Sequence, residues 1–103
     1  MLIVTMENIP GKTLEPIGIV QGSTIQTVNA FKDIGSSLKT IVGGELGGYN
    51  EMMVKARDLA TQRLIQNASE VGADAIVGVR YASSSVMQGA AEVMAYGTAV
   101  RFI

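Results

Sequence analysis

Cysteine, histidine and tryptophan are absent from this chain, and proline occurs only twice. Without cysteine the chain forms no disulfide and offers no thiol nucleophile. Without histidine it also lacks the commonest general base, and the two residues together are the usual zinc ligands. These absences exclude Ser-His-Asp and Cys-His catalytic arrangements and the ordinary structural zinc sites. We therefore expect no catalytic residues, and an enzyme is the least favoured function class.

Charged residues are also scarce, at 17% of the chain against a usual share of about 25%. The 103 residues are 48% hydrophobic, yet a domain of this size must leave a large share of its residues facing outward. Some outward surfaces must then be apolar, and a monomer rarely exposes large apolar patches. We predict a single domain over residues 1–103 that forms a homo-oligomer.

The charge pattern also limits the partners. The net charge is -1, and the eight lysines and arginines are scattered singly along the chain, so we expect no nucleic-acid binding. No apolar stretch approaches the roughly 18 residues that a membrane span needs, and the N-terminus has neither a basic leader nor a cleavage site. We expect no membrane association and a cytoplasmic location.

Hydrophobic periodicity predicts an α+β fold. Extended patterns predict strands at 2–6, 14–27, 74–81 and 93–103. Apolar spacings of three and four predict helices at 30–42 and 49–71, the second closed by Gly72. Segment 82–92, with three consecutive serines, is typical of an irregular loop or a bulged hairpin end. We expect two layers, a mostly antiparallel sheet covered by two helices, with a second apolar sheet face that something else must cover.

The stretch VGGELGGY at 42–49 is the most unusual segment. Its four glycines free the backbone for a close approach, and a helix whose N-terminal N–H groups attract anions follows directly. It lacks the Gly-Lys-Ser/Thr ending of a nucleotide-binding loop. Two interpretations stay open: a tight corner between two helices, or a polar site at a subunit junction presented by Glu45 and Tyr49.

Arg57, two turns into the second helix, could hold a carboxylate such as Glu45 or Asp58, although a structural role is favoured. Methionine thioethers accept soft ions such as Cu(I), but methionine at helical spacing is usually core. A hard-metal site could also assemble from carboxylates of several subunits. No cofactor is evident, and a bound metal ion is an open alternative.

Three strings carry a family resemblance: VGGELGGY (42–49), GADAIVGVRY (72–81) and AYGTAVRF (95–102). In this order and separation they resemble the YbjQ-like family of small bacterial and archaeal proteins, often labelled heavy-metal-binding. The resemblance spans nearly the whole chain. It implies an α+β subunit that assembles into a ring, a pentamer, with strands of adjacent subunits forming an extended barrel-like sheet. Among the matching positions, Glu45, Tyr49 and Asp74 offer chemistry.

Three functions follow from these observations. The first is a ring-forming binding or scaffold module without catalysis. The second is a heavy-metal-binding protein that uses carboxylates or methionines at subunit junctions. The third is a binder of a small ligand or anion at the subunit interface, near the glycine-rich loop. The candidate ligand-binding residues are Glu45, Tyr49, Arg57 and Asp74.

Overall fold

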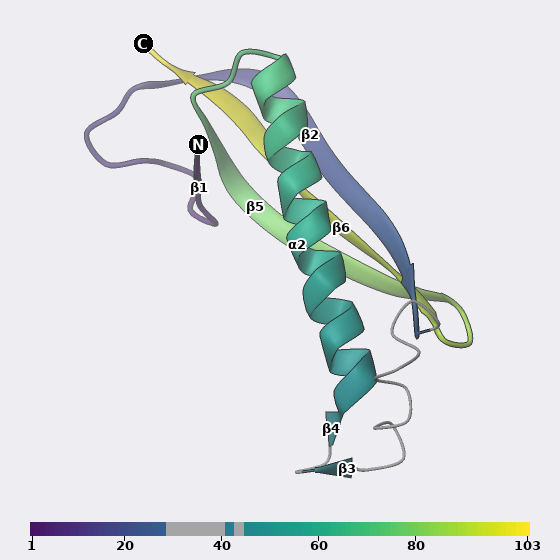
Figure 1. Cartoon of the computed structure of the whole chain (residues 1–103). Helices are drawn as coiled ribbons and strands as arrows, with labels where there is room; N and C mark the ends of the chain where they lie inside the picture. Colours follow the sequence, from purple (N-terminus) through teal and green to yellow (C-terminus); the bar gives the residue numbers. More distant parts are fainter. Residues whose placement is uncertain (29–40, 43–44) are drawn as a thin grey trace.

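The computed structural model describes residues 1–28, 41–42 and 45–103. Within them, one long helix, α2 (Gly47–Glu70), lies lengthwise over one face of a four-stranded sheet (Figure 1). The strands are β1 (Leu2–Ile3), β2 (Leu14–Thr27), β5 (Ala75–Met87) and β6 (Ala90–Phe102), in the order β1-β5-β6-β2. The short β1 is parallel to β5, and the other pairs are antiparallel. A separate two-stranded sheet, β3 (Ile41–Val42) with β4 (Glu45–Leu46), precedes α2.

The predicted α+β class, the bounds of the strand at 14–27 and the long helix are confirmed. The helix is closed by Gly72, as predicted, and its end forms a Schellman motif. Gly72 has a φ of 76°, its N–H donates to the Ser69 carbonyl oxygen at 3.1 Å, and the Ala73 N–H donates to that of Ala68 at 3.0 Å. Glycine adopts this left-handed conformation without the steric cost that a Cβ would add.

Two predicted segments need correction. The predicted loop at 82–92 is wrong, and the alternative of a bulged hairpin end is right: β5 continues to Met87, β6 begins at Ala90, and the register shifts between Ser85 and Met87. Pairing with the neighbouring strand overrides the weak strand preference of serine. The predicted helix at 30–42 lies outside the described residues apart from Ile41 and Val42, which form β3 rather than a helix end.

The helix lies unusually close to the sheet. Its buried residues follow a strict spacing of four and are mostly small: Gly48, Met52, Ala56, Ala60, Leu64 and Ala68. On β2, Gly22 lies directly beneath the helix, and a Cβ built there would be 2.5 Å from the Ala60 carbonyl oxygen. Small residues on both sides therefore let two backbones approach each other, and the main core forms between α2 and this face of the sheet.

The opposite face of the sheet is covered at one end by the chain itself. Here Ala75, Val77 and Val100 form a second, smaller core, over which Val4, Ile9, Leu14 and Phe102 pack. The N-terminal segment thus supplies part of the cover that the sequence predicted. Further along the same face, Ile19, Ile25 and Tyr96 stay exposed, Ile19 by 83%. In the described part of the chain, no helix is long and apolar enough to cross a membrane.

Candidate functional site

A groove runs between the N-terminal half of α2 and the β5–β6 hairpin. It consists of two hollows of about 100 and 320 Å³, and both are lined by Met53 and Ser83. Arg57 and Tyr81 line the smaller hollow, and Tyr49 lines the larger one together with the serines of β5. The groove is therefore rich in hydroxyl groups and has one cationic side chain.

Two of the residues predicted from the sequence line this groove, each in a different hollow. Tyr49, half-buried in the first turn of α2, and the exposed Arg57 lie eight residues apart on the same helix, about 12 Å along its axis. Glu45 lies in β4, two residues before the helix begins. The glycine-rich segment is thus followed directly by a helix, as expected, and α2 positions both groove residues.

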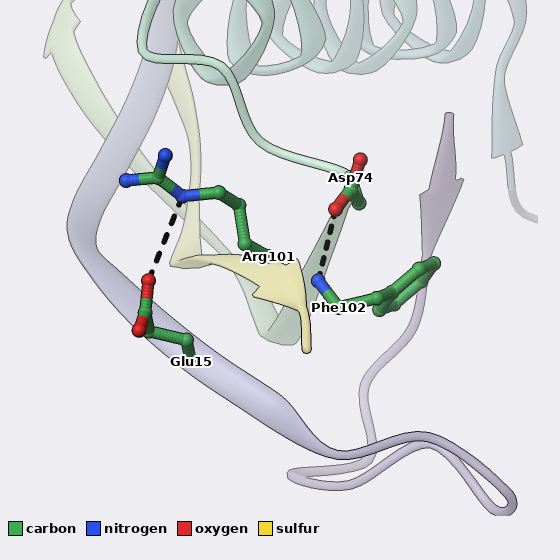
Figure 2. Close-up of polar contacts among 4 residues, drawn as sticks. All are labelled: Glu15, Asp74, Arg101 and Phe102. Carbon is green, nitrogen blue, oxygen red and sulfur yellow. Dashed lines mark hydrogen bonds and ion pairs between the residues drawn. The ribbon is translucent and has the colours of Figure 1, made fainter.

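The structure places Asp74 elsewhere, beyond the other end of α2, whose axis runs about 32 Å from Tyr49 to Glu70. Its Oδ2 accepts a hydrogen bond from the Phe102 N–H at 2.9 Å (Figure 2), and its own N–H donates to the Val100 carbonyl oxygen at 2.8 Å. Asp74 therefore fixes the end of β6 beside the start of β5. Nearby, Arg101 and Glu15 form a half-exposed ion pair at 3.7 Å, a kind of contact that contributes little to stability.

Sequence reasoning missed a chain of hydroxyl groups that reaches the groove through Tyr81. Thr61 Oγ1 donates to the Arg57 carbonyl oxygen at 2.7 Å and lies 2.7 Å from the Tyr81 hydroxyl. Because a threonine hydroxyl has a single proton, Tyr81 must be the donor in the second contact. The chain of hydrogen bonds fixes the Tyr81 ring against α2. No spacing in the sequence linked Tyr81 to a helix 20 residues earlier.

A second, larger cavity of about 510 Å³ lies on the sheet face opposite α2. Three polar side chains line it, those of Glu7, Arg80 and Thr98, together with the apolar side chains of Leu14, Pro16, Val77 and Val100. Neither Glu7 nor Arg80 is among the candidate ligand-binding residues predicted from the sequence. The signal that was available is an arginine two residues after a glycine in an otherwise apolar strand.

Comparison with known proteins identifies the family. The family model YbjQ_1, described as "Putative heavy-metal-binding", matches residues 1–103. The chain belongs to the YbjQ family. It is 53% identical to a UPF0145 protein of Clostridium novyi and 55% identical to one of Alkaliphilus metalliredigens, in both cases over the full length of both chains. A UPF0145 protein of Thermotoga petrophila is 47% identical over 98% of this chain and 96% of its own.

The YbjQ-family chain also has a structural relative. A crystal structure of a protein of unknown function from Pediococcus pentosaceus, assigned to the DUF74 family, matches with a TM-score of 0.63 and 16% identity. The match covers 100% of this chain and 98% of that one. At this identity the likeness supports the α+β fold and nothing further.

The donor groups of this YbjQ-family member do not fit a heavy metal. Soft metals prefer thiolate and imidazole, and the chain has neither cysteine nor histidine. Among the described residues, no group of three or more carboxylates lies close enough together to hold a metal ion. Of the methionines, Met52 is fully buried in the core, whereas Met87 is 67% exposed on the hairpin. Among the described residues of one subunit, therefore, no metal centre matches the family description.

Proposed function

We propose that this YbjQ-family chain is one subunit of a closed homo-oligomeric ring that serves as a binding or scaffold module without catalysis. The family resemblance implies five subunits. The observation that carries the proposal is a sheet with two different edges, each of which, among residues 1–28, 41–42 and 45–103, lacks a partner strand over part of its length.

The first edge is that of β5. The N-terminal segment pairs with β5 only as far as Val79, whose N–H donates to the Val4 carbonyl oxygen at 3.0 Å. From Arg80 to Met87, β6 is the only strand beside β5 in the described part of the chain. An edge strand of this length is a template for another chain unless something covers it.

The second edge is that of β2, and within the described residues α2 blocks only its middle. The Gln21 N–H donates to Asn67 Oδ1 at 3.0 Å, and Arg63 Nη1 donates to the Ser23 carbonyl oxygen at 2.7 Å. These side chains occupy the backbone groups that would otherwise attract a strand. The two edges are therefore unlike, and joining unlike surfaces gives a head-to-tail contact that closes into a ring when the rotation permits.

Apolar side chains on the sheet face opposite α2 support the same assembly. Ile19 and Ile25 on β2 and Tyr96 on β6 point to this face and are exposed in the single chain. Burying side chains of this size stabilises an interface by about 1.5–3 kcal/mol each. In the proposed ring, neighbouring sheets form the inner layer and the helices lie outside.

Native mass spectrometry of the purified chain tests the proposal directly. One closed assembly with a single subunit number is expected, and a monomer at micromolar concentration would refute it. Ile19→Lys should dissociate the ring, because it places a charge in the interface, whereas Val54→Lys, at an exposed apolar position on α2, should leave the mass unchanged. Dissociation by both variants or by neither would contradict the proposed location of the interface.

A further inference from the structure

We infer that the cavity on the sheet face opposite α2 binds a small dipolar molecule that carries a carboxylate, an ammonium group and an apolar portion. The cavity measures about 510 Å³, within the range of roughly 300–1,000 Å³ that small-molecule sites occupy. The inference is argued from residues of one chain and does not rest on the proposed ring.

Two β-bulges shape this part of the sheet. The register shifts in β2 between Pro16 and Gly18 and in β5 between Val77 and Arg80, on either side of the same stretch of β6. Side chains alternate between faces along a strand, so one extra residue in β5 moves every later side chain to the other face. The bulge therefore places Arg80 beside Tyr96 on the cavity face, whereas a regular strand would turn it toward α2.

The guanidinium group of Arg80 is held in a defined position. Its Nη1 donates to the carbonyl oxygens of Thr5 and Val79, both at 2.9 Å, which uses both protons of that nitrogen. Toward the described residues, the Nε and Nη2 protons make no hydrogen bond, and no carboxylate lies within 4.0 Å. Nε and Nη2 together form the planar fork that binds a carboxylate through two parallel hydrogen bonds.

Glu7 brings the opposite charge to the same cavity. Its carboxylate lies more than 4.0 Å from the Arg80 guanidinium, and it forms neither an ion pair nor a side-chain hydrogen bond with the described residues. Two opposite charges that line one cavity without pairing are complementary to a ligand that carries both charges. Leu14, Val77 and Val100 supply an apolar wall for the rest of the molecule, and Gly78, where a Cβ would meet nothing within 4 Å, leaves the backbone open to the ligand.

The experiment is an NMR titration of the full-length, isotope-labelled chain with three matched probes. Leucine has both charges, 4-methylpentanoate lacks the ammonium group, and 3-methylbutylamine lacks the carboxylate. Leucine is expected to shift the amide signals of Gly78 and Thr98 and to bind about three- to tenfold more tightly than either analogue. Equal affinity of leucine and the amine, or no shift at these amides at about 50 mM leucine, would overturn the inference.

Two variants and one control assign the charges. Arg80→Gln is expected to weaken leucine binding about tenfold or more, and Glu7→Gln about three- to tenfold without changing the affinity for 4-methylpentanoate. Arg101→Gln, which removes the other arginine of the sheet, should change neither the affinity for leucine nor that for 4-methylpentanoate. Unchanged leucine binding in Glu7→Gln would overturn the inference even if Arg80→Gln failed to fold, because the exposed Glu7 supports no described contact. The native mass of these variants separates a failed ligand site from a failed ring.

Discussion

Replacing Gly22 by alanine should separate α2 from the sheet. A Cβ at this position would lie 2.5 Å from the Ala60 carbonyl oxygen, 2.6 Å from the Arg63 carbonyl carbon, and closer still to the Leu64 nitrogen. All three are backbone atoms of one helix, so no side chain can rotate away. Because ordinary contacts between heavy atoms are about 3.5–4.0 Å, the helix would have to move away by about 1 Å.

The loss of stability depends on how much contact between α2 and the sheet this movement removes. To the main core, α2 contributes Ala56, Ala60, Leu64 and Ala68, whose burial is worth about 4–5 kcal/mol in total at about 0.8 kcal/mol per methyl or methylene group. A gap of about 1 Å forfeits up to half of the contact energy, and residual strain adds to the loss. The lower entropy of the unfolded alanine variant offsets about 0.4–1 kcal/mol. We expect a net loss of about 2–4 kcal/mol in the free energy of unfolding.

Urea unfolding followed by circular dichroism measures this loss, at one fixed subunit concentration because assembly also contributes to stability. Ser23→Ala is the matched control: this exposed residue follows Gly22 on the same strand and points away from α2, so its cost should stay within about 0.5 kcal/mol. A Gly22→Ala variant with the stability of the wild type would refute the close approach of helix and sheet.

Three further changes test single contacts. Asp74→Ala should speed amide exchange at Phe102 and cost about 1 kcal/mol, because the N–H loses its carboxylate acceptor; unchanged exchange would contradict that role. Asn67→Ala should likewise speed exchange at Gln21 and cost about 0.5–1.5 kcal/mol in urea unfolding, and protection that persists would mean that another group covers this edge. Gly72→Ala should lower the free energy of thermal unfolding by about 1–2 kcal/mol, since alanine must adopt a positive φ; equal stability would show that the helix end rearranges.

The elements that follow from local pattern were predicted well. The second strand and the long helix depend on periodicity within a continuous segment, and Gly72 marks the helix end through its own conformational freedom. The extent of the β5–β6 hairpin was not predictable in the same way. Its serines carry little strand preference, and only pairing with β6 holds them extended.

The candidate sites also differ in whether local sequence or long-range contacts bring their residues together. Tyr49 and Arg57 share a helix, so a spacing of eight residues already places them near one groove. Asp74 lies after the turn that ends α2 and not on the helix itself. The fold uses its carboxylate for a backbone contact at the far end of the helix. Glu7 and Arg80 are separated by most of the chain, and their meeting depends on how the N-terminal segment packs against the bulged β5.

The sequence by itself determined the fold class, the long helix with its closing glycine, and the exclusion of cysteine and histidine chemistry, because composition and short-range periodicity suffice for each. Only the tertiary structure decided which face Arg80 occupies, how closely α2 approaches Gly22, and which sheet edges stay unpaired in the described chain. Strand register, bulges and packing distance arise from contacts between residues far apart in the chain, and no local pattern encodes them.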